Sequence, residues 1–309
     1  MKPSVQAPLS ALRLAEIIDE EDLLPPGVYN VLTGDQECGS ALSSHPDIAK
    51  VSLIGSVGTG KKILSAAANT VKHVGLEMGG KNALIAYPDQ DIDVIADGAI
   101  MGMNLTWAGQ SCGSTSRVFL HASHYDAVLE KIVAGCTHYV PGDPTDPKTT
   151  MGPLISKAQY EKSLMYIQAG IEEGATLKCG GKACNAKGFE DGFFVQPTVF
   201  SDVTMSMRIA REEIFGPVLS IFRWEDEDEL FKQVNDSDYG LSAAIFTKDL
   251  TTAHRAAARV EAGYIWVNHA GPHFIGAPFG GYKQSGLGRE EGLEELLAST
   301  NTKNINIKL

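Results

Sequence analysis

The segment WAGQSCGSTSR sets Cys112 among small and polar residues. A structural cysteine is normally surrounded by apolar neighbours, whereas a cysteine among glycines and serines can be exposed, with its backbone N–H facing a developing oxyanion. This setting is typical of a nucleophilic thiol. An inert cysteine in a turn is the alternative, and the segment by itself leaves both interpretations open.

The segment GLEMGGKN places Glu77 at the end of an apolar run and before two glycines. A carboxylate at the end of a strand, partly removed from water, can have a raised pKa and act as a general base. A surface glutamate before a turn is the alternative. Glu77 is therefore a second candidate catalytic residue.

The segment IGSVGTGKKI resembles a phosphate-binding loop. Gly55, Gly60 and Lys61 fit the G-x-x-x-x-G-K-[ST] pattern, but Lys62 stands where a hydroxyl would bind Mg²⁺ beside a triphosphate. An apolar run ends at Gly55, and Ser56 precedes an expected helix, whose free N–H groups and dipole attract phosphate. The pattern favours a diphosphate bridge over a triphosphate. A helix start with a glycine for close packing is the alternative.

These candidates lie within a regular alternation of expected elements. Helical periodicity covers residues 9–21, 38–45, 57–68, 91–104 and 157–174. Short apolar runs bounded by turn residues predict a buried strand over 48–55 and further strands over 25–34, 71–80 and 82–87. Strand, helix, strand at this spacing is typical of a parallel α/β sheet. Residues 301–309 alternate like an exposed edge strand, which would usually pair with something.

Length and charge narrow the class of protein. The 309 residues are enough for two domains. The formal net charge of -12 argues against a nucleic-acid partner, which needs a basic surface. The apolar runs are too short to span a bilayer, and the first ten residues contain no apolar signal region. We therefore expect a cytoplasmic protein with no membrane or nucleic-acid partner.

The cysteines and histidines do not form a metal-binding pattern. Five cysteines are scattered along the chain, an odd number that favours reduced thiols over a disulfide framework. Cys179 and Cys184 have no second pair or nearby histidine to complete a zinc site. His269 and His273 lie among Gly and Pro, where no helix would bring them to one face. We expect no metal site.

Five motifs in chain order resemble those of aldehyde dehydrogenases. They are LEMGGKN (76–82), GQSC (109–112), EEIFGPV (212–218), WVN (266–268) and PFGGYKQSGLGRE (278–290). Their order and spacing match throughout, and the resemblance covers essentially the whole chain. The chain is therefore identified as a member of this family that lacks the usual N-terminal segment.

The resemblance implies an α/β fold with a partial Rossmann-type cofactor domain, an α/β catalytic domain and a C-terminal oligomerisation strand. We expect the cofactor domain over residues 1–79 and the catalytic domain over 80–284. Residues 285–299 would return to the cofactor domain, and residues 300–309 would form the oligomerisation strand. The resemblance therefore also implies a homo-oligomer.

The resemblance gives the two candidate catalytic residues their roles. Cys112 matches the thiol that attacks the aldehyde carbonyl to give a thiohemiacetal, and Glu77 matches the residue that activates water to hydrolyse the later thioester. The implied activity is NAD(P)-dependent oxidation of an aldehyde to a free acid, rather than transfer to coenzyme A. Three aromatic residues near these motifs, Trp107, Phe274 and Phe279, are the candidate lining for an apolar or aromatic aldehyde.

The resemblance places cofactor residues in three parts of the chain. The pyrophosphate turn is matched by Gly55, Ser56, Thr59 and Gly60, and the residues that hold the nicotinamide ribose and flank the ring are matched by Glu213 and Phe215. The segment KPSV keeps Lys2 and Ser4 of the family's KPSE but has Val5 at the glutamate position. A carboxylate there binds ribose hydroxyls and repels a 2′-phosphate. The expected cofactor is therefore NAD or NADP, and the valine slightly favours use of both cofactors or of NADP.

Two hypotheses follow for the activity of this chain. In the family, the absent N-terminal segment supplies the first strands of the nucleotide sheet, an oligomerisation hairpin and an asparagine of the oxyanion hole. Losing one such donor typically costs about 10²–10³ in kcat. Intact Cys112, Glu77 and Glu213 favour a working aldehyde dehydrogenase, whereas the absent donor favours an impaired relative that acts in oligomerisation or partner binding. Lys62 disfavours a third hypothesis, a triphosphatase.

Overall fold

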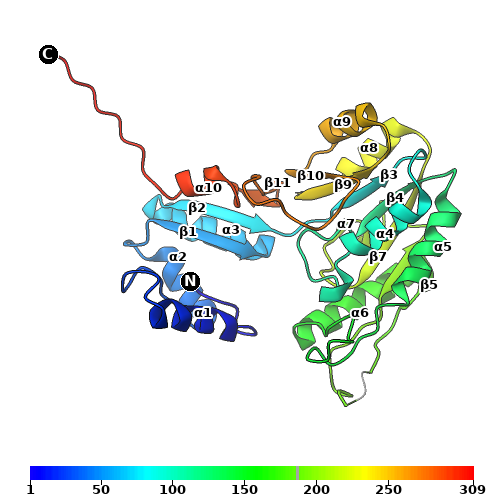
Figure 1. Cartoon of the computed structure of the whole chain (residues 1–309), viewed down its shortest axis with the longest axis horizontal. Helices are drawn as coiled ribbons and strands as arrows, with labels where there is room; N and C mark the ends of the chain where they lie inside the picture. Colours follow the sequence, from blue (N-terminus) through cyan, green and yellow to red (C-terminus); the bar gives the residue numbers. More distant parts are fainter. Residues whose placement is uncertain (186–187) are drawn as a thin grey trace. The chain divides into compact units, whose positions relative to one another are not determined.

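The computed structural model describes residues 1–185 and 188–309 (Figure 1). The described residues form two compact units, Met1–Gly75 and Leu76–Leu309. The boundary falls inside strand β2 (His73–Met78), close to the expected end of the cofactor domain at residue 79. The four expected domain ranges, including the return of residues 285–299, stay predictions.

The first unit contains three helices and the start of a small sheet. Its elements are α1 (Leu9–Glu20), α2 (Gln36–Ser44), β1 (Lys50–Gly55), α3 (Val57–Ala67), the short 3₁₀ helix η1 (Ala68–Thr70) and the beginning of β2. The predicted helices over 9–21, 38–45 and 57–68 are confirmed. So are the strands predicted over 48–55 and 71–80.

Two predictions for the first unit are wrong. Residues 25–34 do not form a strand, because Pro25 and Pro26 donate no backbone hydrogen bond and Gly27 turns the chain with φ 84°. Strand β1 is not buried: Ile54 is 71% exposed, and among residues 1–75 only Ser43, Gly60 and Ala67 are buried. A unit of this size has few elements with which to cover both faces of a strand.

The second unit is built around a seven-stranded sheet in the order β10-β9-β3-β4-β7-β6-β5. Every neighbouring pair is parallel except β5 and β6, which confirms the predicted parallel α/β sheet. The strands are β3 (Ala83–Ala86), β4 (Arg117–His121), β5 (Thr176–Cys179), β6 (Thr198–Ser201), β7 (Val218–Trp224), β9 (Ser242–Phe246) and β10 (Tyr264–Val267).

Helices cover both faces of this sheet, as the almost continuous apolar strands require. They are α4 (Ile92–Gly102), α5 (Tyr125–Cys136), α6 (Lys157–Glu172), α7 (Arg208–Arg211), α8 (Glu227–Asn235) and α9 (Leu250–Arg259). Successive residues of β3 alternate between two apolar clusters: Ile85 packs with residues of α6, α8 and α9, whereas Leu84 packs with residues of α4 and α5. The helices predicted over 91–104 and 157–174 are α4 and α6.

The remaining elements of the second unit are short. They are the 3₁₀ helix η2 (Leu105–Trp107), the pair β8 (Tyr239–Gly240) and β11 (Tyr282–Lys283), strand β12 (Gly286–Leu287), which pairs with β2, and helix α10 (Leu293–Leu297). Residues 301–309 are exposed, and no strand of the described chain pairs with them. Their role as an edge strand that pairs with another copy stays a prediction.

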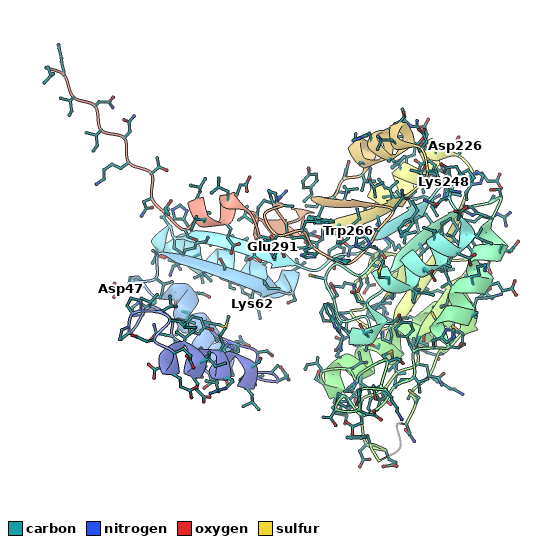
Figure 2. The ribbon with its side chains drawn as sticks, viewed as in Figure 1. Asp47, Lys62, Asp226, Lys248, Trp266 and Glu291 are labelled. Atoms are coloured by element: carbon teal, nitrogen blue, oxygen red, sulfur yellow. The ribbon has the colours of Figure 1, made fainter. Side chains whose placement is uncertain are left out.

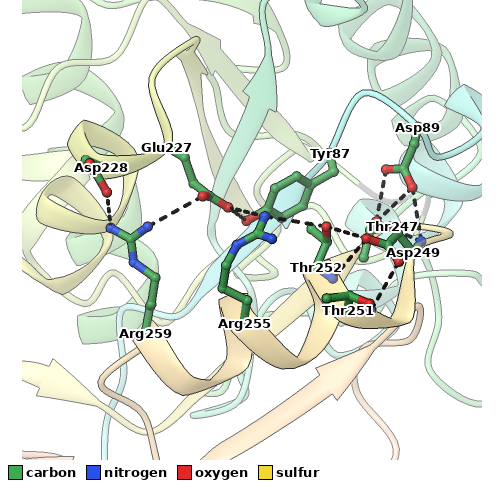
Figure 3. A network of polar contacts seen from close by, with 10 residues as sticks. All are labelled: Tyr87, Asp89, Glu227, Asp228, Thr247, Asp249, Thr251, Thr252, Arg255 and Arg259. Atoms are coloured by element: carbon green, nitrogen blue, oxygen red, sulfur yellow. Dashed lines mark hydrogen bonds and ion pairs between the residues drawn. The ribbon is translucent and has the colours of Figure 1, made fainter.

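The carboxyl ends of the parallel strands meet at one edge, where a polar network joins the loops (Figure 3). Glu227 accepts hydrogen bonds from the Tyr87 hydroxyl at 2.6 Å and from Arg255 at 3.0 Å, and it forms an ion pair with Arg259. Burial alone would raise the pKa of Glu227, but the bonds from Tyr87 and Arg255 lower it. Loops that follow β3, β7 and β9 are thereby tied together.

In the same network, Asp89 accepts hydrogen bonds from donors of the turn between β9 and α9 (Figure 3). Its carboxylate accepts from the Thr247 hydroxyl at 2.8 Å, from the Lys248 N–H at 2.7 Å and from the Asp249 N–H at 3.1 Å. Asp249 in turn caps α9 by accepting from the N–H groups of its first turn. One carboxylate therefore accepts hydrogen bonds from three groups of this turn, and the Asp249 N–H also donates to the Thr247 hydroxyl at 3.1 Å.

We expect Asp89→Ala to lower the free energy of unfolding by about 1–3 kcal/mol, because the backbone donors of the turn lose their charged acceptor. The measurement is urea denaturation of the variant beside the unchanged chain. Asp191→Ala, at an exposed loop position, is the matched control and should change little. Equal losses in the two variants would contradict a role for Asp89 in holding this edge.

Candidate active site

The loop that carries Cys112 connects α4 to β4 and is held by the side chain of Asn82. The Asn82 amide nitrogen donates to the carbonyl of Cys112 at 2.7 Å and to that of Ser114 at 3.0 Å. Its oxygen accepts from the N–H of Ser242 at 3.1 Å. Asn82 is 3% exposed, so these bonds form away from water and fix the loop firmly.

The position of this loop follows from the parallel sheet. Asn82 stands immediately before β3, and the backbone of the loop leads directly into β4, so both lie where the strands begin. We call this end of β3, β4 and β7 the amino edge. Cys112 packs against the apolar cluster that contains Trp266 of β10, which is labelled in Figure 2. A Cβ added at the neighbouring Gly113 would lie 3.7 Å from the ring of Trp266. The candidate site therefore lies at the end of the sheet opposite to the network of Figure 3.

The thiol of Cys112 is partly buried, and the charges of two carboxylates act on it. Burial is the main reason that its pKa is raised, and the negative charge of Glu213 adds to the shift. Backbone hydrogen bonding by Gly113 and by Cys112 itself lowers the pKa, while the charge of Glu77 raises it, and the N–H of Gly113 also donates to the Ser111 hydroxyl at 3.3 Å. The structure thus brings the predicted nucleophile and the predicted base into electrostatic range, together with Glu213.

Glu77 is buried without a hydrogen-bond partner. Its side chain is 4% exposed, and neither carboxylate oxygen is hydrogen-bonded by any described residue. Burial, followed by the charge of Glu290, raises the pKa of Glu77 to about 8, against a smaller lowering effect of Arg289. A carboxyl group kept neutral near pH 7 in this way is typical of functional sites.

Strand pairing and a glycine make room for this carboxylate. Glu77 lies opposite Gly286 in the pairing of β2 with β12. Gly280 has φ 156°, and a Cβ at that position would lie 2.7 Å from an oxygen of Glu77. A side chain at residue 280 would therefore displace the carboxylate, which gives a physical reason for the glycine in the motif PFGG.

Hydrogen bonds from Gly80 and from Gln159 of α6 hold the loop before β7. The N–H of Gly80 donates to Glu213 at 3.2 Å, and burial raises the pKa of Glu213 while this bond lowers it. Phe215 has φ 58°, a conformation that an aromatic residue rarely adopts. Gln159 of α6 stabilises it by donating to the carbonyls of Ile214 at 2.8 Å and Phe215 at 2.7 Å.

Glu212 ties the same loop to α6 and α7. It accepts from the Tyr166 hydroxyl at 2.5 Å and pairs with Arg208 at 2.8 Å, whose guanidinium lies 5.0 Å from the centre of the Tyr166 ring. The Arg208 hydrogen bond is the main reason that the pKa of Glu212 is lowered. The two neighbouring carboxylates therefore differ: Glu212 is a paired structural anion, and Glu213 is more buried and raises the pKa of the Cys112 thiol by its charge.

The predicted pyrophosphate turn lies in the first unit and has the expected local structure. Ser56 is the N-cap of α3: its hydroxyl accepts from the N–H of Thr59 at 3.3 Å, and the two side-chain oxygens are 3.0 Å apart. Gly60 is buried in the first turns of the helix. The earliest N–H groups of α3 are those that a helix leaves without intrahelical partners, so they are available to an anion.

The N-terminal candidates lie in the same unit. Lys2 lays its methylene chain over Gly39 of α2 and donates to the Pro3 carbonyl at 3.0 Å, while Ser4 donates to Gln6 at 2.9 Å. Val5 is 56% exposed. A side chain that accessible has room for a ligand group beside it, and valine has no charge to repel a phosphate.

The comparisons with known proteins agree on one family. A model described as "Aldehyde dehydrogenase family" matches residues 1–305. The chain belongs to the aldehyde dehydrogenase family.

Individual relatives are similar over essentially all of this chain. Aldehyde dehydrogenase tropH of Talaromyces stipitatus is 56% identical, covering 100% of this chain and 60% of that protein. A betaine aldehyde dehydrogenase of Mesorhizobium japonicum is 47% identical, covering 99% of this chain and 63% of that protein. The chain therefore spans about 60% of the length of these relatives.

Solved structures show the same fold. The NAD+ complex of an aldehyde dehydrogenase from Bacillus cereus matches with a TM-score of 0.94 and 41% identity, over 99% of this chain and 62% of that one. A betaine aldehyde dehydrogenase from Staphylococcus aureus in complex with NAD+ matches with a TM-score of 0.91 and 39% identity, over 96% of this chain and 58% of that one. The predicted partial aldehyde dehydrogenase fold is therefore confirmed.

The three aromatic substrate candidates of this chain do not share one environment. Trp107 and Phe274 are 62% and 63% exposed, and both rings are therefore accessible to a ligand. Phe279 is buried, with its ring stacked 4.3 Å from that of His273 and packed beside Tyr264. Phe279 is therefore placed to support neighbouring rings from below the surface. The substrate roles of all three residues stay predictions.

Sequence reasoning missed two buried residues of the motif LEMGGKN. Asn82, described above, could have been suspected because a polar residue directly precedes a fully apolar strand. Lys81 is 2% exposed, and its ammonium group is hydrogen-bonded by no described residue. Burial and the neighbouring charge of Arg117 lower the pKa of Lys81 to about 7. Nothing in the local pattern distinguishes Lys81 from an ordinary surface lysine.

Within residues 1–185 and 188–309, no group of three or more His, Cys, Asp or Glu residues is arranged to hold a metal ion. In the same residues, no helix combines the length and the apolar character that crossing a membrane requires.

The buried carboxyl of Glu77 predicts a pH-dependent stability. Its folded pKa of about 8 exceeds the ordinary value of 4.5, so the folded state binds the extra proton and loses stability as pH rises between these values. We expect Glu77→Gln to match the unchanged chain near pH 5 and to be more stable at pH 9, by about 1–3 kcal/mol. Urea midpoints at the two pH values measure this difference.

Glu130→Gln, at an exposed position of α5, is the control and should gain no stability at pH 9. A Glu77→Gln variant that shows the same offset at both pH values would contradict the inferred titration of Glu77.

Proposed function

We propose that this chain oxidises an aldehyde to a carboxylic acid, with NAD or NADP as hydride acceptor and Cys112 as nucleophile. The observation that carries the proposal is the pairing of a partly buried thiol with Glu77, a buried carboxyl group that no described residue hydrogen-bonds. Two similar solved structures are complexes with NAD+, which supports the proposed cofactor.

The residues present fit a dinucleotide cofactor. The N-terminus of α3 offers backbone N–H groups to a pyrophosphate, and Glu213 and Phe215 are candidates for the nicotinamide ribose and ring. Bound NAD(P)+ would supply the acceptor for the hydride that aldehyde oxidation releases. Val5 leaves no carboxylate near the adenosine end to repel a 2′-phosphate, so we propose that the chain accepts both cofactors.

In the first chemical step, the Cys112 sulfur attacks the aldehyde carbon and the carbonyl oxygen becomes an oxyanion. The backbone N–H groups of Gly113 and of Cys112 itself, which lower the pKa of the thiol, are the candidate donors of the loop for the developing charge. Asn82 keeps that loop in place through its bond to the Cys112 carbonyl. Loss of hydride from the thiohemiacetal leaves a thioester on Cys112.

In the second step, Glu77 removes a proton from the water that attacks the thioester. It can do so only in its ionised form, and its pKa is raised to about 8. We therefore propose that hydrolysis of the thioester accelerates as the pH rises through this value. The carboxylic acid leaves, and the Cys112 thiol is regenerated.

A second candidate function is a catalytically impaired aldehyde dehydrogenase that acts in oligomerisation or partner binding. It is favoured by the raised pKa of the Cys112 thiol, which reduces the thiolate available for attack, and by the exposed surface of the first unit. A homo-oligomer is proposed for both candidates. A cytoplasmic location and the absence of nucleic-acid and membrane partners stay predictions.

The deciding experiment is aldehyde-dependent formation of reduced cofactor by this chain, with NAD and NADP tested separately. We expect turnover with both cofactors and its loss in Cys112→Ser. Glu77→Gln should still release about one equivalent of reduced cofactor per chain in a burst, with slower steady turnover by about 10²–10⁴-fold, because hydrolysis lacks its base. Cys184→Ser controls for general thiol effects.

Retained turnover in Cys112→Ser would overturn the proposed nucleophile. A folded, soluble chain that forms no reduced cofactor with any aldehyde would instead favour the impaired candidate.

The exposed rings of Trp107 and Phe274 predict a preference for aromatic aldehydes. We expect kcat/KM for benzaldehyde to exceed that for acetaldehyde by about 10-fold or more, and Phe274→Ala to remove most of this advantage, because apolar contacts are worth about 1–3 kcal/mol. Leu250→Ala, which truncates an exposed apolar residue of α9, is the matched control. Equal values for the two aldehydes would contradict an apolar pocket.

The exposed C-terminal residues predict self-association. We expect light scattering at micromolar concentration to give the mass of an oligomer, and removal of residues 301–309 to shift the distribution towards smaller species, because an unpaired strand is a ready pairing surface. A monomer at that concentration in the unchanged chain would argue against the proposal.

A further inference from the structure

Arg117 is a buried cation that donates its hydrogen bonds to backbone carbonyls. It is the first residue of β4 and is 3% exposed. Its Nε donates to the carbonyl of Lys81 at 2.7 Å, its Nη2 to that of Val234 at 2.9 Å, and its Nη1 to that of Gln233 at 3.4 Å. Burial lowers the pKa of Arg117 to about 10, so the guanidinium is still charged at neutral pH. A charge removed from water in this way depends on the bonds that it makes.

The three carbonyls belong to two segments that are far apart in the chain. Gln233 and Val234 lie in the last turn of α8, where the final carbonyls of a helix have no intrahelical donors. A cation is favoured at this end of a helix, because the helix dipole is negative there. Lys81 lies two residues before the first residue of β3. The Arg117 side chain therefore joins the end of α8 to the start of β3.

Arg117 and Asn82 hold the start of β3 from opposite faces of the sheet. Arg117 stands opposite Ala83 in the pairing of β3 with β4, and Ala83 packs in the apolar cluster that includes residues of α6, α8 and α9. Asn82 is one residue earlier, so its side chain lies on the other face, where it binds the carbonyls of Cys112 and Ser114. The backbone N–H of Arg117 also donates to the Asn82 carbonyl at 3.1 Å. The position of Asn82 therefore depends on Arg117.

We propose that Arg117 is a positioning residue for the Cys112 thiol. Its side chain fixes the backbone that carries Asn82, and the Asn82 amide fixes the loop that carries Cys112. The sulfur is thereby held in one geometry for its attack on the aldehyde carbon. This inference rests on the proposed function, because that attack is the step that Arg117 would assist.

The link needs the shape of the arginine side chain as well as its charge. A guanidinium presents its donors in a planar fork, which here reaches carbonyls of two segments at once. A lysine at this position would keep the charge and most of the stem, but its ammonium group is a single point of donation. We therefore expect Arg117→Lys to fold and yet to leave the Cys112 loop less firmly held.

The first measurement is the rate at which iodoacetamide alkylates each cysteine, followed by peptide mass spectrometry. We expect Arg117→Lys and Arg117→Met to speed the alkylation of Cys112 by about 3–10-fold, because a loosened loop removes part of the burial that raises the pKa of this thiol. Cys136, which is 2% exposed, is the internal control and should react as slowly as in the unchanged chain. This measurement needs no turnover, so it tests Arg117 even in a chain that forms no reduced cofactor.

The second measurement is the burst of reduced cofactor at saturating aldehyde. We expect Arg117→Lys to slow the burst by about 10–100-fold with little change in KM, because a small misplacement of the sulfur affects the chemical step more than binding. Asp89→Ala is the matched control, since it removes hydrogen bonds at the carboxyl edge of the sheet. It should leave the burst rate and the alkylation of Cys112 unchanged.

A double-mutant cycle tests whether Arg117 acts through Asn82. We expect Asn82→Ala alone and Asn82→Ala combined with Arg117→Lys to give alkylation rates of Cys112 within about twofold of each other, because both changes break the same connection.

Three results would overturn the proposal. They are additive effects in the double variant, an unchanged rate at Cys112 in Arg117→Lys, and an equal acceleration at Cys112 and Cys136, which would indicate a general loss of stability. Arg117→Lys decides the question alone where Arg117→Met does not fold.

Discussion

The buried side chain of Asn82 connects the three elements on which the candidate active site depends. One amide group joins the start of β3 to the Cys112 loop, through bonds of 2.7 and 3.0 Å, and to the start of β9 through the N–H of Ser242. Hydrogen bonds inside a protein are directional and costly to leave unmade. These bonds therefore fix the position of the loop that carries the Cys112 thiol and the Gly113 N–H, on which the charges of Glu77 and Glu213 act.

The two edges of the parallel sheet carry different kinds of polar groups. At the carboxyl edge, Asp89 and Glu227 have hydrogen-bond partners for their charges, and the loops there are tied together. At the amino edge, Glu77 and Lys81 are buried with no described partner, and each has a pKa shifted towards its neutral form. Unsatisfied buried groups destabilise a fold unless other regions compensate. The hydrogen-bonded carboxyl edge therefore helps the sheet to tolerate the unpaired buried groups at the amino edge.

Local signals in the sequence predicted the elements that are defined locally. Ser56 before an apolar helix predicted the start of α3, and the run NALIAY predicted strand β3. The strand expected over 25–34 and the burial of 48–55 were wrong, because strand formation and burial depend on partners elsewhere in the chain. Asn82 and Lys81 were missed for the same reason: the residues that give Asn82 its role include Ser242, and those that shift Lys81 include Arg117.

The sequence by itself determined the family, the alternation of helices and strands, and the identity of Cys112, Glu77 and Glu213 as candidates, because these follow from residue types and their spacing. Tertiary structure alone decided which of these groups face one another and how strongly each is removed from water. The physical reason is that burial and charge proximity arise from elements distant in the chain, and these two factors set the pKa values on which the chemistry depends.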